Sequence, residues 1–334
     1  MSLRSVAVRA LAGALYHSRL LGPVGAAAAY ARRPTGFRIL TFHRIGDEND
    51  PFLPALSTTL FAARMAHIAR HYVVLTVEEL VERMRRGRVP RNTLALTFDD
   101  GYRNNLTHAA PILARHGLPA TIFLTTRFIG SSESLWFERL AIAFKTTKRS
   151  EVEFAGQRAW PLNSVTSRLQ ALNAALSHLK RLPDVERQRD LDGLLSRLGG
   201  AAQEPPERPM LTWEEVHALQ SLNFSIGAHT ETHPILSRLE PEQARREVGG
   251  SKRVIEKMLG QPVRAFAYPN GGSLDYDTSI TELVAEAGFS CAVTTRRGLN
   301  TAATSPLELH RGGAWDTHVP TYALQLAYYQ LANS

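Results

Sequence analysis

The amino-acid sequence predicts an α/β protein, a distorted (β/α) barrel of about seven parallel strands with a helical insertion. Seven short runs of strand type alternate along the chain with amphipathic helical segments. One long stretch breaks this alternation, and polar residues suited to catalysis directly follow several of the strands. Alternation of strands and helices is typical of a parallel sheet, either open or closed into a barrel.

The strands are expected where short apolar runs rich in β-branched and aromatic side chains occur. In chain order they are residues 37–42, 72–75, 93–98, 120–125, 223–228, 263–268 and 289–294. Helices are expected between these runs, where apolar residues recur at helical spacing. They are residues 59–70, 77–86, 104–116, 213–221, 241–259 and 279–287.

Residues 131–209 interrupt this rhythm, because they carry almost no strand signal. Apolar residues recur there at helical spacing, as at Leu172, Leu176 and Leu179. The stretch ends in a loop that contains three prolines. We interpret it as a helical insertion within one domain that spans residues 37–334. The sequence leaves open whether the insertion covers the site, binds a partner or only packs.

Length and composition indicate a globular protein with a substantial core. The chain has 334 residues, of which 44% are hydrophobic and 21% charged, so neither disulfides nor a structural metal is needed for stability. Its single cysteine, Cys291, excludes an internal disulfide, and the apolar run around it predicts a buried side chain. The net charge of +8 is spread along the chain without a nucleic-acid-binding motif, and we expect no nucleic-acid partner.

Residues 1–36 are expected to form an N-terminal helical segment that precedes the barrel domain. They are rich in Ala and Leu, but Arg4, Arg9 and Arg19 interrupt the apolar runs. No run is long enough to span a bilayer, and no clear signal peptide is found. The spacing fits either a packing helix or a helix lying on a membrane surface. We therefore expect a protein of the cytoplasm or the inner membrane surface, with this segment as the candidate peripheral membrane contact.

Polar residues that can carry chemistry follow four of the predicted strands. They are His43, the pair Asp99 and Asp100, the pair His229 and His233, and the run Pro269–Asn270. The carboxyl ends of parallel barrel strands face one mouth, where side chains that are distant in sequence can converge. We therefore expect one shared site at this mouth.

The residue types at these strand ends suit a metal-assisted hydrolysis. Adjacent carboxylates at a strand exit point in different directions, so one can bind a metal while the other faces a substrate. His229 and His233 can face one ion if the turn between them is helical. Two imidazoles and one carboxylate make three protein ligands and leave a position for water, as in catalytic zinc sites. A cation there polarises a carbonyl, and the second carboxylate can take a proton from water.

These segments resemble the signatures of the polysaccharide deacetylases, also called carbohydrate esterase family four. Residues 97–101, Thr-Phe-Asp-Asp-Gly, look like the first signature, and residues 229–233, His-Thr-Glu-Thr-His, match the second. Residues 266–271 resemble the third. Residues 40–44, Leu-Thr-Phe-His-Arg, are similar to the start of a bacterial subgroup that acts in surface-polysaccharide metabolism. The resemblance covers residues 37–311 apart from the insertion.

The resemblance implies roles for the residues at the strand ends. Asp99 resembles the catalytic base of the family. Asp100, His229 and His233 resemble the ligands of a divalent metal, usually zinc, with cobalt or nickel as alternatives.

The third signature implies a substrate wall. The backbone N–H of Asn270 would donate to the oxyanion that forms from the acetamide. Tyr268 and Pro269 would form one wall of the sugar groove. Trp136 and Phe137, at the start of the insertion, either stack on sugar faces or pack their helix.

The chain departs from the family at the arginine that orients the base. Many members carry it directly after the Phe of the third signature, where this chain has Ala267. Arg264 lies three residues earlier, and an odd spacing within a strand places side chains on opposite faces. We predict that Arg311 supplies the missing guanidinium.

The general acid is a second departure. The family places a His late in the chain, and His310 is the candidate, although similar members of the subgroup tend to carry Pro there. His43, at the exit of the first strand, is the preferred candidate. A His of near-neutral pKa suits protonation of a leaving amine.

The resemblance implies hydrolysis of N-acetyl groups on the amino sugars of a polysaccharide or of its lipid-linked precursor. An N-acetylated glycan is then the expected partner. One alternative is an amidase or O-acetyl esterase that acts on a smaller substrate. Another is an inactive glycan-binding protein of the same fold, which Ala267 favours and the intact Asp99, Asp100, His229 and His233 oppose.

Overall fold

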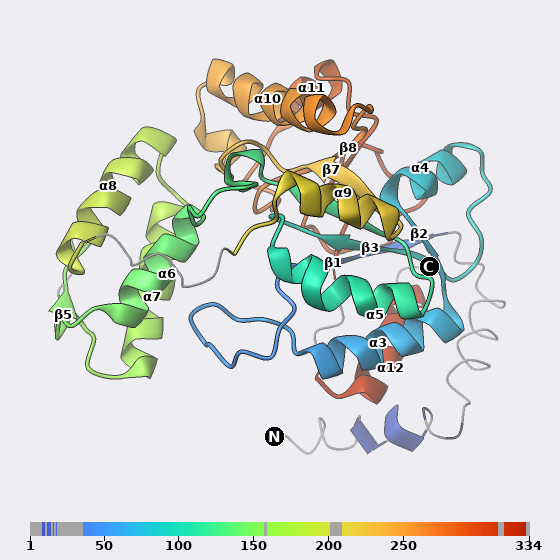
Figure 1. Ribbon diagram of the computed structural model, residues 1–334, viewed down its shortest axis with the longest axis horizontal. Coiled ribbons are helices and arrows are strands. Elements are labelled where there is room, and N and C mark those ends of the chain that lie inside the picture. Colours follow the sequence, from blue (N-terminus) through green and yellow to red (C-terminus); the bar gives the residue numbers. More distant parts are fainter. Residues whose placement is uncertain are drawn as a thin grey trace.

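A parallel sheet of seven strands lies at the centre of the protein, with helices around it (Figure 1). The computed structural model describes residues 36–156, 159–200, 209–312 and 317–331, together with residues 9, 10, 12–14, 16 and 18.

The seven predicted strands are confirmed, with ends that differ by no more than two residues. They are β1 (Arg38–Phe42), β2 (Val73–Leu75), β3 (Thr93–Phe98), β4 (Ala120–Leu124), β7 (Phe224–Ala228), β8 (Ala265–Ala267) and β9 (Cys291–Val293). The strands pair in parallel in the order β1-β3-β4-β7-β8-β9. The remaining strand, β2, pairs in parallel with the first half of β3.

The sheet curls into a half-barrel, and the segment 309–312 bridges its open side between β9 and β1. The Leu309 N–H donates to the carbonyl of Ala292 in β9 at 2.9 Å. The Gly312 N–H donates to the carbonyl of Ile39 in β1 at 3.0 Å. The predicted distorted (β/α) barrel is therefore confirmed, and its closing segment carries Arg311 toward the centre.

The helices predicted from periodicity are confirmed. They are α3 (Thr58–His71), α4 (Val77–Arg85), α5 (Ala110–Arg115), α9 (Trp213–Ser221), α10 (Pro241–Leu259) and α11 (Thr278–Glu286). The expected segment 104–116 begins as a π-helical turn, η1 (Asn105–Ala109), before α5. Local capping sets several ends, such as the Thr76–Glu79 capping box of α4 and the left-handed Gly260 after α10. One further helix, α12 (Val319–Leu331), packs against α3.

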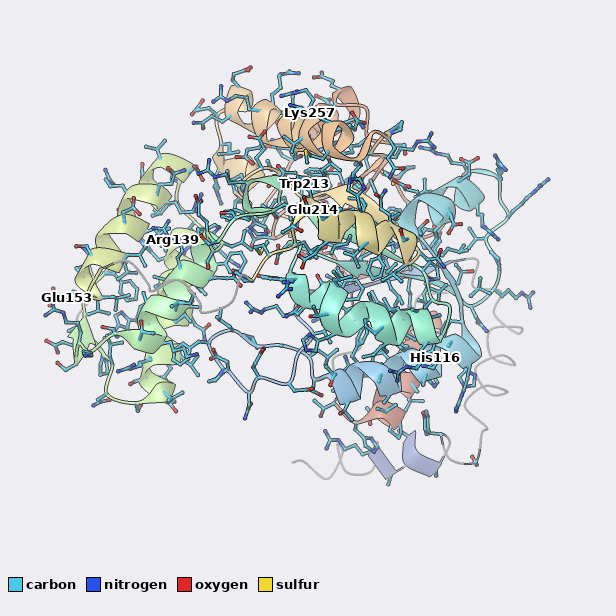
Figure 2. All side chains as sticks on the ribbon, in the orientation of Figure 1. His116, Arg139, Glu153, Trp213, Glu214 and Lys257 are labelled. Carbon is cyan, nitrogen blue, oxygen red and sulfur yellow. The ribbon has the colours of Figure 1, made fainter. Side chains whose placement is uncertain are left out.

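The insertion forms a helical unit beside the barrel (Figure 1). It contains α6 (Trp136–Thr146), α7 (Val165–Leu179) and α8 (Asp184–Arg197), which enclose an apolar core of their own. Charged side chains such as Arg139 and Glu153 cover its outside (Figure 2). It also holds a small hairpin, β5 (Glu151–Val152) with β6 (Trp160–Pro161), which the sequence did not reveal because two-residue strands show no periodicity.

Two further predictions bear on the core and on the N-terminus. Cys291 is fully buried in β9, as its apolar surroundings predict. Within the described residues, no helix combines the length and the apolar character needed to cross a membrane. The predicted N-terminal segment 1–36 and its candidate membrane contact lie mostly outside the described residues.

Candidate functional site

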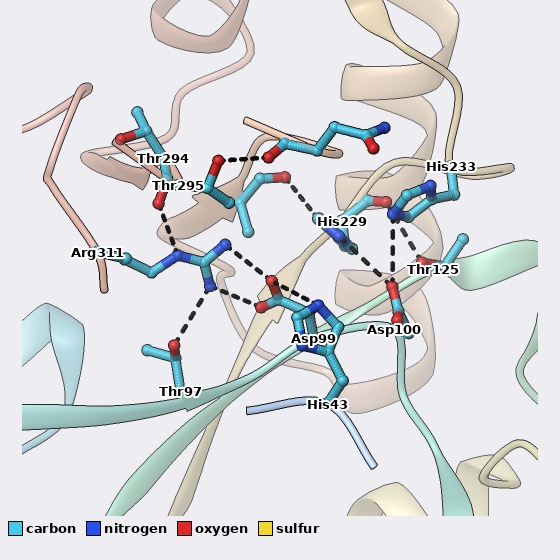
Figure 3. A network of polar contacts seen from close by, with 12 residues as sticks. His43, Thr97, Asp99, Asp100, Thr125, His229, His233, Thr294, Thr295 and Arg311 are labelled. Carbon is cyan, nitrogen blue, oxygen red and sulfur yellow. Dashed lines mark hydrogen bonds and ion pairs between the residues drawn. The ribbon is translucent and has the colours of Figure 1, made fainter. Parts of the chain in front are cut away.

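The side chains predicted to carry chemistry converge at the carboxyl ends of β1, β3, β7 and β8 (Figure 3). They face one cavity of about 320 Å³. The predicted site residues that line it are His43, Asp99, Asp100, His229, His233, Tyr268 and Asn270. Parallel strands end at the same mouth of a barrel, and this geometry brings together residues that are far apart in the sequence.

Asp100, His229 and His233 form a buried cluster in which each residue offers one ligand atom. Asp100 Oδ1 lies 3.6 Å from His229 Nε2 and 3.5 Å from His233 Nε2. The three ligand atoms lie within 4.8 Å of one another. Within the described part of the chain, the buried Asp100 Oδ1 has no hydrogen-bond partner. Zinc and similar divalent cations take such a set of one carboxylate and two imidazoles, so the cluster fits a metal ion.

The loop 229–233 brings the two imidazoles together without a helical turn, so the helical condition attached to their spacing is not needed. Thr230 and His233 adopt left-handed φ values of 68° and 61°. The Thr230 hydroxyl accepts a hydrogen bond from the His233 N–H at 3.0 Å. Glu247 of α10 accepts hydrogen bonds from two successive N–H groups of the loop, at 2.8 and 2.9 Å. This tight loop brings the two ring centroids within 4.9 Å.

His229 is oriented by β8. Its Nδ1 lies 2.7 Å from the carbonyl oxygen of Ala267. A carbonyl only accepts, so Nδ1 carries the proton and the lone pair of Nε2 faces Asp100. Burial lowers the pKa of His229 to about 4. The ring is therefore neutral near pH 7, which is the form that binds a metal.

Asp99 forms a buried, two-point ion pair with Arg311. The Arg311 Nη1 and Nη2 atoms lie 2.7 and 2.8 Å from the two carboxylate oxygens (Figure 3). The Arg311 guanidinium also donates to the Thr294 carbonyl at 2.9 Å and to the Thr97 hydroxyl at 3.2 Å. Burial alone would raise the pKa of Asp99, but the charge of Arg311 outweighs it and holds that pKa well below its usual range. Asp99 is therefore ionised. Arg264, the other arginine considered for this role, is exposed on the protein surface.

The adjacent Asp100 has the opposite electrostatic surroundings. The φ of 77° at Asp100 turns the backbone after β3, so the Asp100 carboxylate points away from the Asp99 carboxylate. Burial, with the negative charges of Asp99 and Glu138, raises the pKa of Asp100 well above its usual value. A bound divalent cation would supply the positive charge that this carboxylate lacks. The two aspartates therefore suit different tasks.

The two candidates for the general acid occupy different places. His43 lines the cavity, and its Nε2 lies 3.9 Å from Asp99 Oδ2 with half of the side chain exposed. Partial burial in the cavity wall lowers the pKa of His43, with Asp99 opposing this effect and Arg311 adding to it. The His310 ring instead packs against Gly298 and does not line the cavity. Neighbouring side chains of an extended segment point to opposite sides. The Arg311 side chain points into the barrel, and the His310 side chain therefore points out of it.

The segment after β8 forms part of the cavity wall. Tyr268 is fully buried, stacks on Tyr276 at 4.4 Å between ring centroids and donates to the Leu307 carbonyl at 2.9 Å. Asn270 has a left-handed φ of 57°. Tyr268 and Asn270 line the cavity, whereas Pro269 is not among the residues that line it.

A buried glutamate of the insertion, which the sequence did not single out, supports the candidate metal cluster. Glu138 of α6 is 2% exposed and pairs with Arg44 at 2.6 Å. The Tyr102 hydroxyl faces the carboxyl groups of both Glu138 and Asp100. The Arg44 guanidinium lies over the Tyr102 ring at 4.8 Å. A glutamate in the first turn of a helix is usually an exposed residue that interacts favourably with the helix dipole. The sequence alone therefore did not reveal this buried contact.

Trp136 and Phe137, the two residues before Glu138, contact the loop 229–233, which carries both candidate histidine ligands. Trp136 Nε1 donates to the carbonyl of His233 at 3.2 Å. The Phe137 ring meets the His233 ring edge to face at 5.3 Å. Trp136 is 6% exposed and therefore packs its helix, while Phe137 lines the cavity. The first turn of α6 thus contacts His233 directly and reaches Asp100 through Tyr102.

The fold and the site together define a barrel protein whose cavity combines a carboxylate–imidazole cluster with an ionised buried aspartate. The family model described as polysaccharide deacetylase matches residues 86–292. This match covers more than half of the chain, and the chain belongs to the polysaccharide deacetylase family.

Individual relatives agree with this assignment. The chain is 22% identical to the YxkH protein of Bacillus subtilis over 281 residues, 84% of this chain and 71% of that protein. It is 31% identical over 98 residues to the poly-beta-1,6-N-acetyl-D-glucosamine N-deacetylase of Staphylococcus epidermidis, which covers 29% of this chain and 32% of the relative. The fold is similar to that of IcaB from Ammonifex degensii, with a TM-score of 0.57 and 19% identity over 89% of this chain and 98% of that one.

Proposed function

We propose that the protein is a metal-dependent hydrolase that removes N-acetyl groups from the amino sugars of a polysaccharide or of its lipid-linked precursor. One observation carries the proposal: Asp99, paired with Arg311, lies beside the Asp100, His229 and His233 cluster in a single cavity. The Staphylococcus epidermidis relative, named for N-deacetylation of poly-beta-1,6-N-acetyl-D-glucosamine, supports this class of substrate.

Each residue of the site has a task in this reaction. Asp100, His229 and His233 would hold the cation, with zinc the first choice and cobalt or nickel as alternatives. When bound, the cation lowers the pKa of water and polarises the acetyl carbonyl. Asp99, kept ionised by Arg311, accepts the proton of the attacking water.

The remaining tasks fall to the opposite walls of the cavity. The backbone N–H of Asn270 donates to the oxyanion as the acetyl carbon becomes tetrahedral. His43 donates a proton to the nitrogen of the leaving amine, because an unprotonated amide nitrogen leaves poorly.

An acetate-release screen tests the proposed function. The substrates are oligomers of poly-β-1,6-N-acetylglucosamine, chitin-like oligomers, peptidoglycan fragments and lipid-linked N-acetylated precursors, each with zinc, cobalt or nickel. We expect acetate and a free amine in equal amounts from at least one of them. No acetate from any substrate with the metal-loaded protein would contradict the proposal.

Metal removal is expected to abolish acetate release. The purified protein should hold about one equivalent of divalent metal, since the cluster provides one set of three ligands. His233→Ala should lose this metal, as measured by elemental analysis of the dialysed protein. His310→Ala, a His outside the cavity, is the matched control and should keep the metal. A metal-free sample with full activity would refute the role given to the cluster.

His43→Ala and His310→Ala separate the two candidates for the general acid. We expect His43→Ala to lower kcat by about 10²–10⁴-fold, the usual contribution of a positioned acid. His310→Ala should keep the activity of the unmodified protein, because its ring lies outside the cavity. The measurement is steady-state acetate release. Equal and mild effects of the two changes would exclude both residues.

Glu138→Gln is expected to weaken metal binding by about 10–100-fold, the usual effect of losing a partner of a metal ligand. The change keeps the shape of the side chain but removes the charge that faces Tyr102 and Arg44. Competition with a chelating dye measures the affinity without any turnover. Glu133→Gln, an exposed change just before α6, is the control. Equal affinities of the two variants would show that Glu138 only anchors the helix.

A further inference from the structure

The cavity that holds the candidate site has a second wall, and this wall is apolar. The loop between β1 and α3 and the helices α6 and α7 of the insertion contribute it. Its side chains include Phe52, Leu53, Pro54, Phe137, Leu172 and Leu176. The candidate metal ligands and Asp99 line the same cavity. A substrate that reacts at the polar wall therefore also meets the apolar wall.

The apolar wall is a built part of the fold. Lys145 of α6 pairs with Asp50 at 2.7 Å and ties the loop to the insertion. Leu53, Phe137 and Leu176 pack against the core of the insertion but stay partly exposed where they line the cavity. The outside of the same unit carries charged side chains (Figure 2). Apolar surface left open to a polar reaction centre gains free energy when an apolar group covers it.

The cavity is closed at its base and opens to solvent both beside the insertion and beside His43, whose side chain is half exposed. Asp100 and His229, at its base, are 1% and 2% exposed. Pro54 and Lys180, which line the same cavity, are exposed to solvent. One of these openings thus leads from the buried base to the protein surface beside the insertion.

The closed base decides which end of a substrate meets the apolar wall. The acetyl carbonyl must reach the base of the cavity, where Asp99 and the metal cluster lie. The sugar and its substituents then extend toward the mouth. A hydrocarbon chain that covers the wall is therefore attached on the sugar side and not on the acyl side.

We propose that the insertion forms a subsite for a hydrocarbon chain carried by the aglycone of an acetamido sugar. The preferred substrate class is then an amphiphilic acetamido-glycoside, and a fully polar glycan leaves the wall uncovered. The inference rests on the proposed deacetylation and adds the chemical class of its substrate. It also assigns the insertion a task, since its helices α6 and α7 supply Phe137, Leu172 and Leu176 of the wall.

Binding of reaction products tests the subsite without any turnover. Methyl, butyl, hexyl and octyl glucosaminides, the amines that deacetylation would leave, are titrated calorimetrically into the zinc-loaded protein. Each added methylene should tighten binding by at most about fourfold, the limit set by full burial of that group. Affinity that does not change from methyl to octyl would overturn the subsite. A clear gain in affinity from methyl to octyl, with no acetate released from the corresponding acetylated glycosides, would support the subsite and refute only the proposed deacetylation.

Variants of the wall locate the effect. Leu176→Asn and Leu53→Asn replace an apolar side chain by a polar one of similar size. Each should reduce the gain in affinity with increasing alkyl chain length. Val185→Asn, at a position of α8 that is 70% exposed and outside the cavity, is the matched control and should retain the full gain. Thermal melting of each variant verifies its fold. An undiminished gain in both cavity variants would overturn the assignment to this wall.

A second series distinguishes the two ends of the substrate. Methyl glycosides that carry N-propionyl, N-butyryl or N-hexanoyl groups replace the acetyl group and keep the aglycone short. We expect their kcat/KM to fall as the acyl chain grows, because the base of the cavity is buried. A gain with chain length that occurs only in this acyl series would overturn the assignment to the aglycone.

Discussion

Arg311→Met is expected to lower the free energy of unfolding by about 3–5 kcal/mol, because it leaves the Asp99 carboxylate buried without its ion-pair partner. Both side chains are almost fully buried, so solvent screens the pair little. Equilibrium unfolding in urea measures the change. Arg264→Met, which removes an exposed arginine, is the control and should change stability little. Equal stabilities of the two variants would show that the pair is not essential for folding.

The same variant should change the pH dependence of activity. Arg311 depresses the pKa of Asp99, so the ion pair stabilises the fold fully above the pKa of an unfolded aspartate, about 3.9, and less as pH falls. Without Arg311, burial raises the pKa of Asp99 and the acid limb of kcat/KM should move to higher pH. An unmoved acid limb would show that Arg311 does not set the ionisation of the base.

Asp99→Asn is expected to reduce acetate release by at least about 10²–10⁴-fold while the metal stays bound, because an amide cannot accept the proton that a carboxylate base removes. The change keeps the size of the side chain, and none of the three candidate ligands is altered. Acetate release and metal content, measured on one preparation, test both parts of the expectation.

Asp100→Asn is the matched comparison, one residue further along the chain. It should lose the metal, because the neutral amide replaces the one anionic ligand of the cluster. Loss of metal from Asp99→Asn and its retention in Asp100→Asn would reverse the tasks of the two aspartates.

The strands were predictable because the information that specifies them is local. Apolar runs that include β-branched threonines, such as residues 93–98, give a buried strand wherever helices cover both faces of a parallel sheet. The helices α4 and α10 likewise carry their own caps and periodicity. The convergence of Asp99, Asp100, His229 and His233 followed from one topological rule, that parallel strands end at a common mouth.

The path of the loop that carries the two histidines could not be predicted from the sequence. A helical turn from His229 to His233 was one way for both rings to face one ion, but two left-handed residues bend this segment more tightly. Spacing alone allowed both histidines to face one ion and did not specify the path between them. The backbone conformation of such a loop depends on partners from other elements, here Glu247 of α10.

Sequence alone thus indicated the barrel, the insertion and the residue types of a carboxylate–imidazole site. Only the tertiary structure decided which distant groups complete that site. Arg311 reaches Asp99 across 212 positions because the closing segment of the barrel lies against β9 and β1. Glu138 reaches the surroundings of Asp100 because the insertion folds back onto the cavity. Periodicity reports which face of an element is buried, but long-range packing determines the partner that this face meets.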